Sequence, residues 1–343
     1  MHRSIPLAAL VTCALSGPVA HAALPVDDAL SLKPVLSNLL GNETRLGDAI
    51  AALDLDEGRA DAFRALVDDE KLTVLGLTRE ARAAVGADGV ADPQAVAAYN
   101  EAVADFAAAQ AERLETLLGE DGYDAFLAYA EPRWQADAER WGEMKIEAGQ
   151  LTYNVFCTQY NAYTTYEVAV PDKYVKFAAQ GTQYHSGYPA DGDYRVTLNR
   201  GGAPYTVRVY EVGPWNIDDN YWNAANDPER PRRLFTDLPK GMPEAQAAYQ
   251  NGYNGGKDQY GRTVLNPGGC DLSIQVAADI GLNYLQNDWI DVTYLWESGG
   301  GSTGGGCLAP VPGGLPLGRA DAFGALFLIG GMALFGRRRR GSN

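Results

Sequence analysis

The chain has 343 residues, of which 46% are hydrophobic and 10% aromatic, and its formal net charge is −16. A chain of this length allows about two domains of roughly 100–200 residues, and the composition is that of a globular protein with a sizeable core. The negative net charge repels nucleic acid and anionic lipid headgroups, so neither is an expected partner of the folded part. Neutral glycans, or glycans bridged by cations, are the partners that this charge leaves open.

The first 22 residues have the layout of an export signal. Arg3 supplies a positive charge, an apolar stretch runs from Ile5 to Leu15, and Ala20-His21-Ala22 is a small-residue cleavage site. We therefore expect an exported protein whose mature chain starts near Ala23.

Residues 23–150 are predicted to form a helical bundle. Apolar residues recur with helical spacing between Asp92, the expected N-cap, and Gly119, with Pro93 at the first helical position. A second helix is expected over about 121–146, kinked or broken at Pro132, and shorter helices around 46–53 and 57–67. The aromatic side chains of this region are expected to pack in the core of the bundle rather than line a ligand groove.

A β domain is predicted for residues 151–298, because the composition changes near residue 150 to Tyr, Thr, Val, Asn and Gly. Alternating stretches separated by Gly-, Pro- and Asn-rich turns indicate strands at 163–170, 194–198, 205–210 and 290–295. A polar insertion at 216–269 interrupts them, and an ordered insertion of this length is more often functional than not. The expected fold class is thus α+β, with the helices and the strands in separate domains.

Three cysteines follow the expected signal: Cys157, Cys270 and Cys307. Export to an oxidising compartment favours a disulfide, and a bond between Cys157 and Cys270 would join the two ends of the β domain. Cys307 lies in a flexible tail, and the sequence leaves its state open.

The C-terminal part consists of a glycine- and proline-rich linker at 299–312 and a hydrophobic tail at 313–343 that carries four arginines, Arg337 to Arg340, near its end. The apolar stretch 322–335 would reach about 21 Å as a helix, which is short of a hydrocarbon core of about 30 Å. The order of a proline motif, a short apolar helix and a basic cluster resembles the PEP-CTERM and VPLPA-CTERM sorting tails of Gram-negative bacteria, although Arg319 and Asp321 interrupt it.

That resemblance implies contact with the membrane only through the tail, and processing by an exosortase-type enzyme. It also implies a location at the cell surface, in the periplasm or at the outer envelope, with release possible after processing. A simple C-terminal membrane anchor is the alternative, and in both cases the arginines should stay cytoplasmic while the body is exported.

Three motifs occur in a fixed order in the β domain: Gly192 to Thr197, then Val207 to Trp215, then Asp271-Leu272-Ser273 with Ala277 to Leu282. In this order, over about residues 155–296, they resemble the double-psi β-barrel of the rare lipoprotein A-like (RlpA-like) and expansin-like families. The resemblance implies a cleft for glycan strands such as peptidoglycan or exopolysaccharide. Some members of these families are peptidoglycan lytic transglycosylases, and others bind glycans without cleaving them.

The resemblance also suggests site residues. By position, Asp271 is the acid/base carboxylate, Glu211 stands where the family usually has Asp, and His185 precedes Gly192 as a family histidine does. Cleavage requires protonation of the leaving oxygen, for which a carboxyl with a raised pKa is suited. The alternatives are that Asp271 only caps the following helix and that Glu211 only pairs with Arg208 or Arg262.

Four aromatic residues offer flat faces on which sugars could stack, with core packing as the alternative: Trp215, Tyr184, Tyr221 and Trp222. Residues 216–220 offer oxygen ligands, but their spacing matches no calcium loop, and one histidine with three cysteines makes a zinc site improbable. No metal and no cofactor are expected. Two hypotheses thus remain: a glycan-cleaving enzyme, or a catalytically silent glycan-binding or matrix protein.

Overall fold

The computed structural model describes residues 22–86, 88–141, 145–147, 150–162, 164–185 and 187–298, without the side chains of 145–147. These residues all belong to one compact unit of the chain. The expected signal (apart from Ala22), the linker, the sorting tail and Cys307 lie outside the described residues. Within the described part, no helix is long and apolar enough to cross a membrane.

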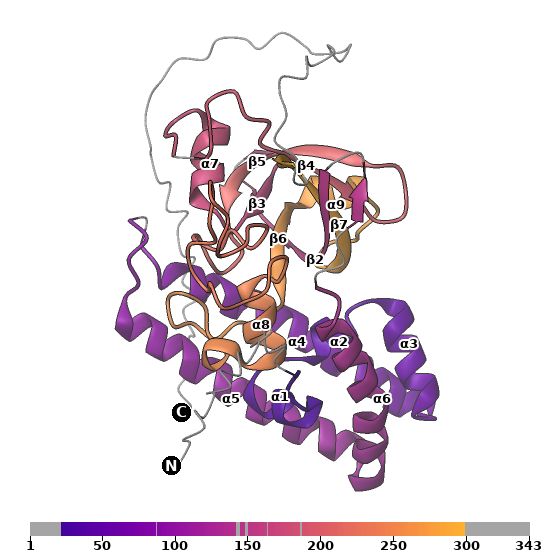
Figure 1. Cartoon of the computed structure of the whole chain (residues 1–343). Helices are drawn as coiled ribbons and strands as arrows, with labels where there is room; N and C mark the ends of the chain where they lie inside the picture. The colour runs from indigo at the N-terminus through magenta and orange to yellow at the C-terminus, as the bar shows by residue number, and fades with distance from the viewer. Residues whose placement is uncertain are drawn as a thin grey trace, which may run out of the picture. The chain divides into compact units, whose positions relative to one another are not determined.

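The N-terminal part of the chain is helical, as predicted. Asp92 caps its helix by accepting hydrogen bonds from the amides of Gln94 and Ala95 at 2.9 and 3.3 Å. The helix that contains Pro132 continues past it and ends at Ala138, earlier than expected. The helices of this region are α1 (Val26–Leu32), α2 (Leu36–Leu39), α3 (Glu43–Ala52), α4 (Glu57–Ala83), α5 (Pro93–Leu118) and α6 (Glu120–Ala138), of which α4 and α5 pack side by side (Figure 1).

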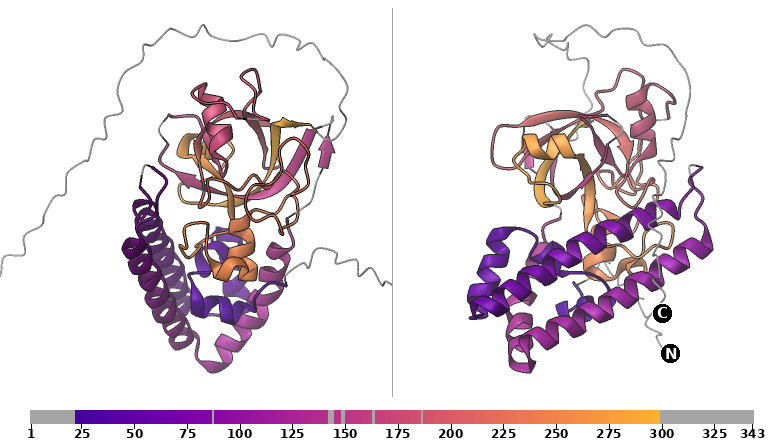
Figure 2. Two further views of the ribbon diagram at one scale, coloured as in Figure 1. Left: turned by 60° about the vertical axis from the view of Figure 1, so that its left-hand side comes forward. Right: turned by 180° about the vertical axis from the view of Figure 1, so that it is seen from behind.

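The C-terminal strands form a closed six-stranded mixed β-barrel (Figure 2). Its order is β2-β6-β3-β5-β4-β7, and pairing of β7 with β2 closes the ring. The pairs β2–β6 and β3–β5 are parallel, and the other pairs are antiparallel. The strands are β1 (Lys145–Glu147, paired to β2), β2 (Gln150–Tyr160), β3 (Val168–Val170), β4 (Arg195–Asn199), β5 (Tyr205–Val212), β6 (Gly268–Ser273) and β7 (Asp288–Ser298).

Short helices connect the strands of the barrel. Helix α7 (Lys173–Gln180) lies with β4 in the connection between the parallel strands β3 and β5, where a crossover is required, and α9 (Ile274–Asp279) follows β6. The insertion carries α8 (Glu244–Asn251) and the short 3₁₀ helix η1 (Tyr253–Gly256).

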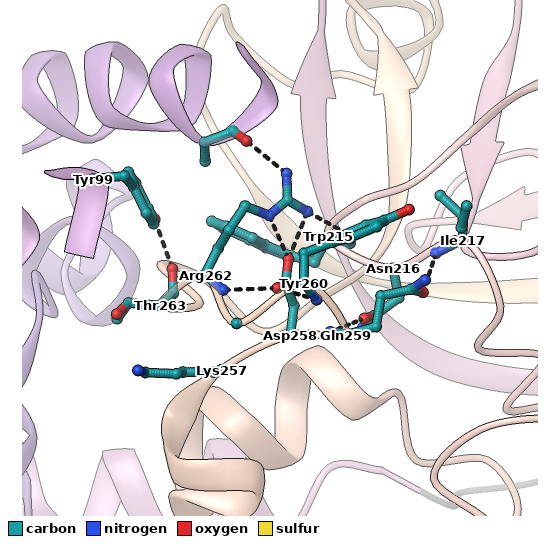
Figure 3. A network of polar contacts seen from close by, with 12 residues as sticks. Tyr99, Trp215, Asn216, Ile217, Lys257, Asp258, Gln259, Tyr260, Arg262 and Thr263 are labelled. Atoms are coloured by element: carbon teal, nitrogen blue, oxygen red, sulfur yellow. Dashed lines mark hydrogen bonds and ion pairs between the residues drawn. The ribbon is translucent and has the colours of Figure 1, made fainter. Parts of the chain in front are cut away.

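The insertion packs against the helices. Trp215, Tyr249 and Leu265 belong to one buried apolar cluster with side chains of α1 to α6. Arg262 reinforces this contact, because its guanidinium donates to the Ala81 carbonyl of α4 at 2.7 Å while also pairing with Asp258 (Figure 3). The helical region and the insertion therefore share one core.

Two residues of the insertion complete the core of the barrel instead. Tyr221 and Trp222 are fully buried and contact Tyr294 of β7 through their rings. The hydroxyl of Tyr221 also donates to the Gly269 carbonyl at 3.1 Å. Neither ring has a face open to a sugar, so the expected stacking role of these two residues is corrected to core packing.

Candidate functional site

One row of residues crosses four neighbouring strands of the barrel. Ala169 of β3 is the register partner of Glu211 on β5 and of Asp271 on β6, and Asp271 is in turn the partner of Thr158 on β2. Residues that lie opposite one another on adjacent strands point to the same face of a sheet. All four residues accordingly line the same cavity.

This cavity has a volume of about 640 Å³, within the range of pockets that hold small ligands. The lining comes from the barrel strands and the turn 213–217 on one part, and from α2, α4, the insertion and the segment before β7 on the other. The polar and aromatic side chains of the lining are mostly uncharged, and they include Tyr160, Asn161, Trp215, Asn216, Tyr260, Asn266 and Asn287.

Asp271 is buried in this cavity, with 3% of its surface exposed. The hydroxyl of Thr158 donates a hydrogen bond to one carboxylate oxygen, and Nη2 of Arg82 lies 3.2 Å from the other. Burial raises the pKa of Asp271 to about 6, and the charge of Arg82 partly opposes this rise. Ser273, not Asp271, caps the helix α9, so the capping alternative for Asp271 does not hold.

The turn after β5 brings the backbone close to this carboxyl group. Gly213 has a φ of +140°, and a Cβ atom built on it would lie 3.9 Å from Oδ2 of Asp271. Glycine fits this position because L side chains rarely adopt such a φ. The Gly-Pro-Trp motif of the sequence thereby forms the floor of the cavity next to the acid.

Glu211 lines the cavity but is paired with a cation. Its carboxylate forms an ion pair with Lys176 of α7 rather than with Arg208 or Arg262. Because Ala169 separates the backbones of Glu211 and Asp271, these lie about two strand spacings, or roughly 10 Å, apart. Glu211 and Asp271 therefore line the same cavity but are too far apart at their backbones to be direct neighbours.

The structure does not bring two of the other expected site residues to the cavity. His185 packs on the ring of Tyr174, with 4.1 Å between the ring centroids, and Tyr184 is an exposed neighbour outside the lining. The expected roles of His185 in catalysis and of Tyr184 in this site are thus not supported. Of the four expected stacking residues, only Trp215 lines the cavity, and its indole N–H donates to Asn266 at 3.0 Å.

Two residues of the site were not anticipated from the sequence. Thr158 follows Cys157 in the chain, and Asp271 follows Cys270. If the two cysteines are neighbours on adjacent parallel strands, the residues after them are neighbours too, so the expected cysteine pair could have indicated Thr158 as the partner of Asp271. Arg82 lies on a helix 189 positions away from Asp271, and no local pattern points to it.

Cys157 and Cys270 are register partners on β2 and β6, both fully buried, and the structure has them as free thiols. Burial and the neighbouring Cys270 raise the pKa of the Cys157 thiol. The strand pairing brings them to the positions that a bond would need, and the disulfide stays a prediction.

The acidic residues of the 216–220 segment are engaged by cations. Asp219 is paired with the buried Arg232 at 2.6 Å, and Asp218 with Lys173 at 2.9 Å. Within the described ranges, no three His, Cys, Asp or Glu side chains gather as metal ligands would.

Comparison with known proteins finds one family model, described as a domain of unknown function (DUF8814), which matches residues 145–293. The matched segment begins at β1 and ends within β7, so it covers the insertion and most of the barrel but none of the helices α1 to α6. No curated protein and no solved structure matches the chain.

Proposed function

We propose that this chain is an exported cell-envelope protein that holds a peptidoglycan or exopolysaccharide strand in the cavity and cleaves it as a lytic transglycosylase, with Asp271 as acid and base. The observation that carries this proposal is the carboxyl group of Asp271, buried in a cavity lined by polar, aromatic and aliphatic side chains, with its pKa raised to about 6. A carboxyl with such a pKa is protonated in a useful fraction of molecules near neutral pH and can donate to a glycosidic oxygen.

The reaction needs one such group. Protonated Asp271 gives its proton to the leaving oxygen as the glycosidic C–O bond breaks. The C6 hydroxyl of the same sugar then attacks C1, and its proton returns to Asp271, which leaves a 1,6-anhydro sugar and requires no water. Between the two steps the negative charge of Asp271 is stabilised by Arg82 and by the hydroxyl of Thr158.

The closed six-stranded mixed barrel with two parallel strand pairs supports a barrel of the double-psi type, as in the RlpA-like and expansin-like families. The expected signal and sorting tail support an envelope location, with an exosortase-type enzyme as a partner in processing.

The alternative is a non-catalytic glycan-binding or matrix protein, and one observation favours it. Both carboxylates of the cavity are paired with cations, Asp271 with Arg82 and Glu211 with Lys176. Such pairing favours the ionised carboxylates, which cannot protonate a glycosidic oxygen.

The test is digestion of purified peptidoglycan by the wild-type protein and by Asp271→Asn, with mass analysis of the released muropeptides. Asp124→Asn, which removes an exposed carboxylate on α6, is the control. Anhydro-muropeptides from the wild type and the control, but not from Asp271→Asn, would support cleavage. Co-sedimentation with peptidoglycan by all three proteins, without products, would leave the binding role and remove Asp271 as a catalytic residue.

A further inference from the structure

The ion pair between Arg82 and Asp271 is asymmetric in its exposure. The side chain of Asp271 is 4% exposed, whereas that of Arg82 is 52% exposed. One nitrogen of the guanidinium, Nη2, faces the carboxylate, and a guanidinium carries five N–H donors. Arg82 thus keeps donors for a ligand on the open side of the cavity, while Asp271 is enclosed behind it.

Arg82 is also the most exposed of the three cations that line the cavity. Arg262 is buried and bound to Asp258 and to two backbone carbonyls. Lys71 pairs with Asp68 of its own helix at 3.0 Å. Among the described residues, the side chain of Arg82 has no hydrogen-bond or ion-pair partner other than Asp271, and its guanidinium carbon lies 6.0 Å from the centre of the Tyr160 ring.

The charge of the cavity differs from that of the whole chain. The charged residues of the lining are three cations (Lys71, Arg82 and Arg262) and two carboxylates (Glu211 and Asp271), in a chain of net charge −16. An acidic protein repels a polyanion over most of its surface, so a cationic group at a cavity is where an acidic ligand would be held. An arginine fork matches the geometry of a carboxylate.

We propose that Arg82 binds a carboxylate of the sugar that occupies the cavity, so that the ligand is an acidic glycan carrying either a uronic acid or the free lactyl group of a muramic acid. This inference rests on the proposed glycan-binding function and names its substrate class. Arg82 is in this role a binding residue that also positions Asp271.

Binding of such a ligand has a consequence for the acid. A carboxylate bound to the other N–H groups of Arg82 shares the charge of the guanidinium with Asp271, so the ligand weakens the interaction of Arg82 with Asp271 without breaking it. The charge of Arg82 holds down the pKa of Asp271, and a weaker interaction raises that pKa. An acidic sugar therefore promotes protonation of the group that cleaves it, and a neutral sugar does not.

Calorimetric titration of the full chain tests the proposal with three probes: neutral chitotriose, trigalacturonate, and a peptide-free oligosaccharide from peptidoglycan with free lactyl groups. We expect the wild type to bind an acidic probe more tightly than chitotriose. Arg82→Gln should weaken binding of that acidic probe by at least about tenfold and leave chitotriose unchanged. Arg79→Gln, an exposed arginine on the same helix, is the matched control and should behave as the wild type.

Asp271→Asn provides a second readout that a merely structural role of Arg82 would not produce. This variant removes the competitor for Arg82, so it should bind the acidic probe several-fold more tightly than the wild type. Arg82→Lys keeps the positive charge but loses the planar, two-pronged geometry of the guanidinium. Its affinity for the acidic probe should lie between those of the wild type and Arg82→Gln. If Arg82→Gln does not fold, as its melting curve would show, the Asp271→Asn comparison decides alone.

The outcomes separate the two proposals. Equal affinity for neutral and acidic probes, with no effect of Arg82→Gln and no gain in Asp271→Asn, would overturn the role of Arg82 and leave a glycan-binding cavity. Binding of none of the probes, together with no binding or digestion of peptidoglycan, would overturn the proposed function as well. A preference for trigalacturonate or for the lactyl oligosaccharide identifies the source of the carboxylate, and either preference supports the proposal.

Discussion

Thr158 and Asp271 are register partners on the parallel strands β2 and β6, and the hydroxyl of Thr158 donates a hydrogen bond to the Asp271 carboxylate. The residues before them, Cys157 and Cys270, are partners on the same two strands. Side chains alternate between the faces of a strand, so the acid points into the cavity and the thiols into the core of the barrel. The strand pair β2–β6 thus carries both the acid of the cavity and the buried pair of cysteines.

Replacing Thr158 by Val should shift the pH dependence of cleavage. The variant keeps the shape of the side chain but removes a hydrogen bond to the ionised carboxylate, so the pKa of Asp271 should rise further above its ordinary value. The basic limb of the rate profile should move upward by about one pH unit. Muropeptide release measured from pH 4.5 to 8 checks this.

The control for that experiment is Thr197→Val. Thr197 shares an exposed hydrogen bond with Thr206 and does not line the cavity. Superimposable profiles for Thr158→Val and the wild type would show that the hydroxyl does not support the ionised acid.

Asp271→Asn should change how stability depends on pH. The folded chain keeps a proton on Asp271 up to about pH 6, whereas an unfolded chain releases it near 3.8. Between these values the folded state binds more protons, so the contribution of this group to the free energy of unfolding falls as the pH rises. Relative to the wild type, the free energy of unfolding of the variant should rise by about 3 kcal/mol between pH 4 and pH 6, and it should not rise further above pH 6.

Urea unfolding at a series of pH values measures this difference, with Asp124→Asn as the control for the loss of one carboxylate. A difference between Asp271→Asn and the wild type that does not vary with pH would contradict a raised pKa for Asp271.

Lys33→Met should change the pH dependence of the free energy of unfolding in the opposite direction. The Lys33 ammonium is buried and donates to the Ala248 and Tyr249 carbonyls of α8, and burial lowers its pKa from 10.5 to about 7. Above pH 7 the unfolded chain binds the extra proton, so the wild type gains stability as the pH rises toward 10.5, whereas the variant lacks this gain. Between pH 7 and about 9.5 we expect the free energy of unfolding of the wild type to rise by about 3 kcal/mol relative to that of Lys33→Met.

Thermal or urea unfolding of both proteins across this range is the measurement. Lys257→Met, which removes a lysine at the end of η1 that no ion pair engages within the described residues, controls for the loss of one positive charge. Parallel curves for Lys33→Met and the wild type would indicate that Lys33 is not buried as the structure has it.

Gly269→Ala should destabilise the fold by about 1–3 kcal/mol. A Cβ atom at this position would lie 2.6 Å from Cγ1 of Val155 and 2.7 Å from Cγ of Pro243, where the insertion meets the barrel. Gly76→Ala is the matched control, because nothing lies within 4 Å of its Cβ position in α4 and alanine should stabilise that helix by up to about 1 kcal/mol. Opposite shifts in melting temperature are expected, and equal shifts would contradict the packing described for Gly269.

The predicted disulfide can be tested by peptide mapping of protein exported to an oxidising compartment. We expect a linked peptide pair containing Cys157 and Cys270 after alkylation in denaturant without reductant. Recovery of both cysteines as alkylated thiols would contradict the bond. Mapping is preferable to a thiol count, because Cys307 can contribute a thiol of its own.

The sequence predicted those elements whose signals are local. The helix α5 follows from the Asp92 cap, Pro93 and the apolar spacing, and the strands β4 and β5 follow from alternation. The strand β2 was missed because it is buried along almost its whole length, and such strands lack the alternation of a half-exposed one.

The site was predicted in part. Asp271, Glu211 and Trp215 line the cavity because their motifs lie at strand ends that the barrel brings together. His185 was chosen for its position in the resemblance, and Tyr184, Tyr221 and Trp222 for their flat rings. Neither criterion reveals whether a side chain faces a cavity, solvent or the core. Arg82 could not be predicted at all, because its contact depends on how a distant helix packs against the barrel.

The core shared by the helices and the insertion limits how the barrel can be studied alone. A fragment restricted to the matched segment 145–293 would leave the apolar side chains of Tyr249, Val264 and Leu265 without the helices that cover them. Such a fragment is expected to aggregate on expression, and it would also lack the guanidinium beside its own acid. A barrel of this kind that occurs without the helical region would need polar residues at the positions of these three side chains.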